Sequence, residues 1–336
     1  MKYRESWLDY LRAFACILVT LGHLLMSFQD AHIIQQGLSV SVFVEVIYCF
    51  HVYIFFFCSG YLFQSKTRES EKEIYTYKIE RSINFLILYV VFSGVTYTIK
   101  LVFSSDVNTA VEYTFLDTLL KHPINQMWYL YAISVIYLFA YPIQTKKAEI
   151  IVVCIVLLIK VMEIGDSAIS VSVNYLFQNM IWFVMGQVFA YRKIKPNKSI
   201  SLSFIFLFAI IFVIRSIFSV DSNILNAFLT FLGIVGSTGV VIGLTKNKAT
   251  ITGPMKYIAK YMLQIYLLHT ICAAGIRIIL LKIGITHIVP HFVFGIVFSF
   301  IIPMACAMVA ERIKFLNIFF FPTKSVKRFW EQIKSK

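Results

Sequence analysis

Long apolar runs recur along the whole chain, and they constrain its fold more than any other feature. A helix needs about 20 mostly apolar residues to cross the hydrocarbon core of a bilayer. Ten runs approach or exceed that length, at about 8–28, 38–64, 82–104, 126–143, 148–164, 171–191, 200–219, 224–245, 257–282 and 288–311. The sequence therefore predicts an all-α fold: a polytopic membrane helical bundle with about ten transmembrane helices.

The polar stretches between these runs are too short to form a second domain. Hydrophobic residues make up 59% of the 336 residues and charged residues only 14%, whereas a soluble domain has about 25% charged residues. We therefore expect a single integral membrane domain over residues 1–336. Its basic end, from about residue 312, is expected to lie on the anionic inner leaflet as an amphipathic segment, with a disordered tail as the alternative.

The distribution of positive charge predicts the orientation. The chain has a formal net charge of +14, which in a soluble protein would suggest a nucleic-acid partner. Here most of the 31 Lys and Arg residues lie in alternate connections between the apolar runs. Positive charge collects on the cytoplasmic side of membrane proteins. We therefore expect both termini in the cytoplasm, membrane lipids as the surroundings and no nucleic-acid partner.

The first apolar run carries three ionisable residues, Asp9, Arg12 and His23. Such groups are costly inside a membrane and usually have a function there. Arg12 and His23 are eleven residues apart, three helical turns, so they share one helix face. Imidazole exchanges protons near neutral pH, so His23 is a candidate general base or nucleophile. Asp9 is one turn from Arg12, and this pair is alternatively a simple anchor at the helix end.

Further polar residues are expected near His23 in the outward half of the bundle. Glu45, in the second run, is a candidate catalytic partner that would orient His23, although it is alternatively a water-exposed residue at a helix end. Trp128 matches an interfacial aromatic belt. His269 and Arg277 share one side of the ninth run. We expect Trp128, His269 and Arg277 to line the acceptor side of a site.

A second group of candidates lies toward the cytoplasmic end. Lys78 and Arg81 lie just before the third run and are one helical turn apart, so they can clamp a phosphate. Positive-inside anchoring explains them almost as well. Ser59 and Gly60 follow three phenylalanines, a pattern typical of a close helix contact. Lys78 and Arg81 are therefore candidates for binding an anionic group at the cytoplasmic end.

The cysteines do not indicate a metal site. All six lie inside apolar runs, none forms a Cys-x-x-Cys pair and none has a histidine at zinc-ligand spacing. Small buried residues are the ordinary interpretation. We therefore predict no metal ligand.

Five segments resemble landmarks of one known family. They are "WLDYLRAFACILVTLGH", "FHVYIFFFCSGYLF", "KIERSINFLILY", "MWYLYAISVIYLFAYP" and "QIYLLH", in that order over residues 7–270. Together they are similar to the acyltransferase-3 family of integral membrane O-acyltransferases, which modify bacterial surface polysaccharides. One position departs from the family pattern, because Lys78 stands where the family usually has arginine, and lysine lacks the bidentate guanidinium.

The resemblance implies a function and a place in the cell. Acetyl-CoA, or another acyl-CoA, would be the cytoplasmic donor, and a sugar hydroxyl on a glycan or lipid-linked glycan would be the acceptor. His23 would match the essential histidine, Arg12 the conserved arginine, and Lys78 with Arg81 the donor-binding pair. Arg12 and Ser59 would take part in donor binding with that pair. The protein would lie in the bacterial plasma (inner) membrane, with polysaccharide-synthesis proteins as possible partners.

Two other functions fit the same buried charges. A transporter or flippase for a lipid-linked glycan would use them as a translocation path. No internal repeat and no matching pair of Gly/Pro-broken helices is visible, which counts against it. A subunit that only scaffolds a polysaccharide synthase is the third possibility.

Overall fold

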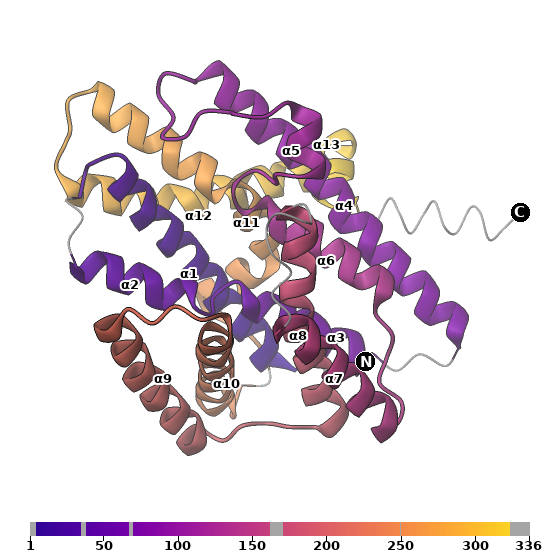
Figure 1. The fold of residues 1–336 in the computed structure, drawn as a ribbon. Coiled ribbons are helices and arrows are strands. Elements are labelled where there is room, and N and C mark those ends of the chain that lie inside the picture. The colour runs from indigo at the N-terminus through magenta and orange to yellow at the C-terminus, as the bar shows by residue number, and fades with distance from the viewer. Residues whose placement is uncertain (1–4, 35–37, 67–69, 162–170, 249, 323–336) are drawn as a thin grey trace, which may run out of the picture.

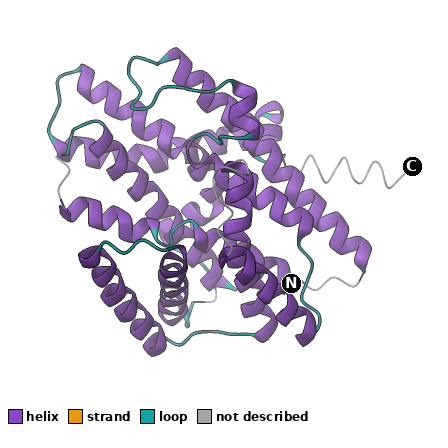
Figure 2. Ribbon diagram, in the orientation of Figure 1, coloured by secondary structure: helices purple, strands orange, loops and turns teal. Residues whose placement is uncertain are grey.

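The computed structural model describes residues 5–34, 38–66, 70–161, 171–248 and 250–322, and within these ranges every regular element is a helix (Figures 1 and 2). The elements are α1 (Ser6–Asp30), α2 (Leu38–Tyr48), α3 (Tyr53–Ser65), α4 (Glu71–Val102), α5 (Phe115–Leu120), η1 (Asn125–Met127), α6 (Trp128–Phe139), α7 (Lys146–Val161), α8 (Val171–Arg192), α9 (Lys198–Phe218), α10 (Asn223–Thr245), α11 (Gly253–Lys282), α12 (Ile288–Arg312) and α13 (Lys314–Phe320). The predicted all-α class is confirmed.

Every one of the ten predicted runs contains helix, but the predicted number of membrane crossings is not confirmed. Seven helical segments in the described part are long and apolar enough to span a bilayer: α1, Val40–Ser65, α4, α9, α10, α11 and α12. α6 and α7 have 12 and 16 residues, below the length of an ordinary crossing. The orientation with both termini in the cytoplasm stays a prediction.

The outer surface of the bundle is apolar, as expected for a protein surrounded by lipid. On α9, Phe206, Ile217 and Phe218 are each about 70% exposed. Soluble proteins rarely expose apolar residues in such density. These side chains therefore face hydrocarbon, and the chain is a membrane protein.

The second predicted run is not one continuous helix. α2 ends at Tyr48 and α3 begins at Tyr53, so residues 49–52 form a turn. The turn contains His51, which is only 3% exposed. It places a backbone break in the interior, and irregular backbone at such depth is tolerated only where protein or a polar cavity surrounds it. The break is therefore a candidate for a functional position.

The core of the bundle is held by a close contact between α3 and α8, the pair of helices with the most extensive contact (Figure 1). Gly60 of α3 faces the backbone of Phe183, and Gly186 of α8 faces the backbone of Phe57. Without side chains at these two positions, the helix backbones approach until only van der Waals distance separates them. The close helix contact expected near Gly60 is therefore present.

α4 extends further toward the N-terminus than expected. It begins at Glu71, so Lys78 and Arg81 lie on its third and fourth turns rather than just before a helix. Ser70 caps it by accepting a hydrogen bond from the Glu73 amide over 3.2 Å.

At the other end of the chain, residues 323–336, which carry most of the expected basic tail, lie outside the described residues.

Glu5 ties the start of α1 to α3 and to the connection after α8. Its carboxylate accepts hydrogen bonds from the Trp7 indole, the Tyr61 hydroxyl and the Lys195 ammonium. Burial raises the pKa of Glu5, but these three hydrogen bonds outweigh burial, so the pKa lies below its ordinary value. The beginning of α1 and the end of α3 therefore share one end of the bundle.

Candidate functional site

His23 lies in α1 beside three other ring side chains from three segments of the chain. Tyr48 ends α2, His51 lies in the turn before α3, and His269 lies in α11. The ring centroid of His23 is 5.6 Å from Tyr48, 6.5 Å from His51 and 5.3 Å from His269. We call His23, Tyr48, His51 and His269 the histidine cluster.

Tyr48 is the hydrogen-bond partner of His23. Its hydroxyl lies 3.0 Å from His23 Nδ1 and 3.3 Å from Met26 Sδ. The direction of the hydrogen bond follows from the tautomer of His23. In the tautomer with the proton on Nδ1, the ring donates to the Tyr48 hydroxyl, and Nε2 carries a lone pair that can act as a base or nucleophile.

Glu45, the partner expected for His23, does not occupy that position. Its side chain is exposed, and the hydroxyl of Tyr48 lies at Nδ1 of His23 instead. Of these two residues on α2, the Tyr48 side chain contacts His23 and the Glu45 side chain is exposed. The expected pairing of Glu45 with His23 is therefore corrected to a pairing of Tyr48 with His23.

Replacing Tyr48 with Phe is expected to lower the rate of any reaction at His23 by roughly 3- to 10-fold, because it removes one neutral hydrogen bond worth about 1 kcal/mol. Glu45→Gln is the matched control on the same helix and is expected to stay within about twofold of wild type. The comparison is made on initial rates at matched protein level. Equal losses in both variants would contradict the assignment of Tyr48 as the partner of His23.

His269 and Arg277 lie on one face of α11, as the sequence indicates. The guanidinium of Arg277 donates to the backbone oxygen and the hydroxyl of Ser27, over 3.1 and 2.7 Å. Arg277 is 3% exposed. Because Ser27 follows His23 by one turn, this contact joins α11 to α1 directly beyond the histidine cluster.

The Trp128 side chain is half-buried and packs against other aromatic rings. Its ring stacks on Tyr175 with centroids 4.7 Å apart, and Phe56 lies 6.1 Å away. The residues just before it do reach α11, because the Gln126 amide donates to Thr270 over 2.9 Å. The start of α6 therefore borders the histidine cluster, while the Trp128 side chain itself packs in the aromatic core.

Three of the four donor-site candidates are connected through tyrosines. Ser59 on α3 lies close to the hydroxyls of Tyr129 and Tyr137 on α6. Arg81 stacks on Tyr77, its guanidinium carbon 5.2 Å from the ring centroid, and Tyr77 packs against Tyr137. These residues lie near the end of α3 and the beginning of α4.

Arg12 joins this group from α1. It lies 3.5 Å from the Asp9 carboxylate and is close enough to Tyr129 to act on it electrostatically. Its side chain remains 24% exposed. Lys78 is half-buried one turn before Arg81 on α4. The structure thus brings Arg12, Ser59 and Arg81 to one region, which lies about 16 Å along α1 from His23 at 1.5 Å per residue.

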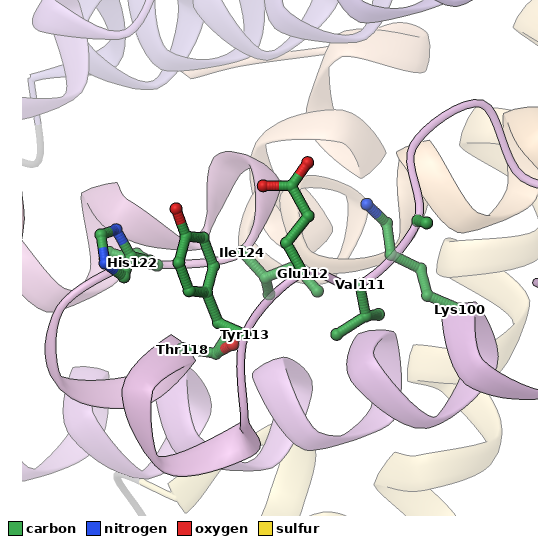
Figure 3. Close-up of a pocket in the computed structure, with 9 residues that line it drawn as sticks. Lys100, Val111, Glu112, Tyr113, Thr118, His122 and Ile124 are labelled. Atoms are coloured by element: carbon green, nitrogen blue, oxygen red, sulfur yellow. The ribbon is translucent and has the colours of Figure 1, made fainter.

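A cavity of about 270 Å³ opens beyond the other end of the histidine cluster (Figure 3). Its polar lining includes His122, Tyr113, Glu112 and Lys100, whose tips turn to the same side in Figure 3. The rings of Tyr113 and His122 stack with centroids 4.0 Å apart.

The segment that forms this cavity is attached to the end of α1. Asn108 donates to the backbone oxygen of Ser27 over 3.2 Å, and Asp106 pairs with Lys282 at the end of α11 over 2.8 Å. Ser27 is one turn past His23. The cavity and the cationic group around Arg12 therefore lie at opposite ends of α1, with His23 between them.

The described residues include no group of three or more His, Cys, Asp or Glu side chains arranged to hold a metal ion. His51 and Tyr48 are the members of the histidine cluster that sequence reasoning missed. A histidine inside an apolar run, directly before the aromatic and small residues of α3, was the available signal for His51.

The fold and the site define an integral membrane protein with a buried imidazole centre between a cationic end and a polar, aromatic end. A family model described as an acyltransferase domain matches residues 5–308. The chain therefore belongs to the acyltransferase-3 family, and its activity is that of a membrane acyltransferase. No curated protein and no solved structure matches the chain.

Proposed function

We propose that this protein transfers an acyl group, acetyl in the first instance, from acyl-CoA to a sugar hydroxyl of a bacterial cell-surface polysaccharide or its lipid-linked precursor. The observation that carries the proposal is the position of His23. It lies between a group containing Arg12, Ser59 and Arg81 and a polar cavity that opens beyond Ser27.

The separation of the two ends suits a coenzyme A thioester. Its charged phosphates and its reactive carbonyl carbon lie at opposite ends of a long flexible arm. Guanidinium groups bind phosphates well, and a nearby serine hydroxyl and tyrosines can line the path of the arm. Arg12 and Arg81 would hold the anionic end while the thioester reaches His23.

The cavity beside Tyr113 supports a sugar as the acceptor. It is lined by a stacked aromatic pair, a carboxylate, an ammonium and a threonine hydroxyl. Sugars combine apolar ring faces with hydroxyl groups, which such a lining can contact and hydrogen-bond. At about 270 Å³ the space is close to the ~300 Å³ lower bound of small-molecule sites, which suits one sugar unit better than a long chain.

The test uses membranes that contain the protein and its native glycan. Acetyl-CoA and succinyl-CoA, each labelled in the acyl group, are supplied in parallel, and label is followed into the extracted glycan. Label from acetyl-CoA supports the proposal, and label from succinyl-CoA alone would revise the donor. A deletion strain separates the alternatives: glycan of normal length without acyl groups indicates the enzyme, failed export indicates the flippase, and loss of the synthase complex indicates the scaffold.

Arg81→Ala is expected to raise the KM for acyl-CoA by about 10- to 100-fold with a smaller effect on kcat, because a charged hydrogen bond contributes roughly 1.5–3 kcal/mol. Lys72→Ala is the matched control, since it removes an exposed positive charge from the first turn of the same helix. Its KM is expected to remain within about twofold of wild type. An unchanged KM in Arg81→Ala would remove Arg81 from the donor site.

A further inference from the structure

His269 is a second imidazole in the histidine cluster, and the proposed acyl transfer at His23 leaves it without a role. It is 1% exposed and lies on α11, which packs on α1. Its Nδ1 lies 3.0 Å from the Ile265 oxygen and 2.9 Å from the Tyr266 oxygen, both in the preceding turn of its own helix. The ring is therefore fixed in place by the backbone.

These hydrogen bonds define which nitrogen of His269 is basic. A carbonyl oxygen only accepts, so Nδ1 must carry the proton that is donated. In the neutral ring Nε2 then has a lone pair. That atom is buried and has no hydrogen-bond partner among the described residues. Leaving a buried acceptor unpaired costs about 1–3 kcal/mol, so an orphan of this kind points to a partner that arrives with the substrate.

The His269 ring lies next to His23. Its Nε2 is on the edge of the ring opposite the α11 carbonyls, so it points away from the backbone of α11. The His23 ring, from the neighbouring helix, has its centroid 5.3 Å away. A substrate group bound at one of these rings is therefore close to the other.

We propose that His269 accepts the proton of the incoming hydroxyl. His23 carries the acyl group after its release from coenzyme A and before its transfer to that hydroxyl. The proposal rests on the proposed function to the extent that the donor is a thioester and the acceptor a hydroxyl. It divides the reaction between two imidazoles: His269, whose hydrogen bonds place its proton on Nδ1, and His23, which reacts in the tautomer with its proton on Nδ1.

In the first step His23 is acylated. Its Nε2 attacks the carbonyl carbon of the thioester, a C–N bond forms, and the C–S bond breaks with its electron pair leaving on the sulfur of coenzyme A. The Nδ1–H of His23 stays on Tyr48 throughout. The products are an acyl-imidazolium and a thiolate, with no proton gained or lost.

In the second step the acyl group moves from His23 to the acceptor. The oxygen of the acceptor hydroxyl attacks the acyl carbon while its proton moves to Nε2 of His269. The C–N bond breaks and returns its electron pair to His23. The resulting His269 imidazolium then gives its proton to the thiolate, so that acyl-CoA and a hydroxyl have become an ester and free coenzyme A, and both histidines are restored.

The test is a rapid-quench measurement on purified full-length protein with acetyl-CoA labelled in the acetyl group and a glycan acceptor. His269→Gln keeps the size and polarity of the side chain but removes the basic nitrogen. It is expected to release up to one equivalent of coenzyme A and retain label on His23, while ester formation falls by about 100-fold or more. His291→Gln is the matched control, because His291 is equally buried, is also bonded through a ring nitrogen to a backbone oxygen and lies outside the histidine cluster, and it is expected to accumulate no labelled protein.

The other outcomes distinguish a failure of the proposed function from a failure of the role proposed for His269. Wild type that forms no ester from acyl-CoA would overturn the proposed function itself. If wild type forms ester and His269→Gln does so at the same rate, only the role of His269 is overturned. The same holds if folded His269→Gln forms neither ester nor labelled protein, or if wild type holds a stoichiometric metal ion that His269→Gln loses, since a metal ligand has no lone pair to give.

Discussion

His23→Ala is expected to abolish acyl transfer, with a loss of at least about 1,000-fold, while the protein remains folded. The His23 imidazole supplies the nitrogen proposed to react at the centre of the site, with Tyr48 as its hydrogen-bond partner. Removing a positioned nucleophile or base typically costs that much or more. The measurement is the initial rate of label transfer from acyl-CoA in membranes matched for protein level.

The folding control for His23→Ala is its thermal unfolding in detergent. His23 is half-buried and joined to its surroundings by one side-chain hydrogen bond to Tyr48. We therefore expect a shift in Tm of only a few degrees. A folded variant that retains most of the wild-type rate would remove His23 from the mechanism.

Gly60→Ala is expected to have the largest effect on stability, lowering the free energy of unfolding by about 3 kcal/mol or more. An added Cβ would lie 1.8 Å from the backbone oxygen of Phe183, so α3 and α8 must separate. Overpacking against side chains costs about 1–3 kcal/mol, and backbone cannot yield as a side chain does. The reciprocal contact of Gly186 with Phe57 would loosen at the same time.

Gly275→Ala is the matched control for Gly60→Ala. Gly275 also lies inside a long helix, α11, but nothing lies within 4 Å of an added Cβ. Alanine favours helix over glycine by about 1 kcal/mol, so this variant is expected to be neutral or slightly more stable. Equal thermal stability of Gly60→Ala and wild type would show that α3 and α8 are not in the close contact described.

The long helices were predictable because each contains an extended apolar run, which is visible in the sequence. The number of crossings was not, because hydropathy gives no measure of how a short helix such as α6 or a polar one such as α8 sits in the bundle. The close contact at Gly60 was also readable, since small residues beside bulky aromatics mark tight helix packing.

The break between α2 and α3 could not be read from the sequence. Residues 49–52 are Cys, Phe, His and Val, with no glycine or proline to interrupt the run. Only tertiary packing shows the turn, and with it the approach of Tyr48 and His51 to His23. By contrast, the early start of α4 was readable, because Ser70 and Glu73 have the spacing of a capping box.

The candidate site was also predicted only in part. Polar residues inside apolar runs are easily recognised in a sequence. The rings of His23 and His269 lie side by side, and Arg277 donates to Ser27, one turn beyond His23. Which residue contacts which depends on side-chain direction and helix packing. That is why Glu45 was expected where Tyr48 is found, and why Trp128 lies in the aromatic core.

The central claim is that this chain alone moves an acyl group from acyl-CoA to a hydroxyl through His23. The most direct measurement reconstitutes purified protein into liposomes of pure lipid, adds acetyl-CoA labelled in the acetyl group with a glycan acceptor, and counts label in the glycan. We predict that wild type transfers label and that His23→Ala, at equal protein and equal fold, does not. Equal transfer by both proteins, or none by folded wild type with either acetyl- or succinyl-CoA, would contradict the account.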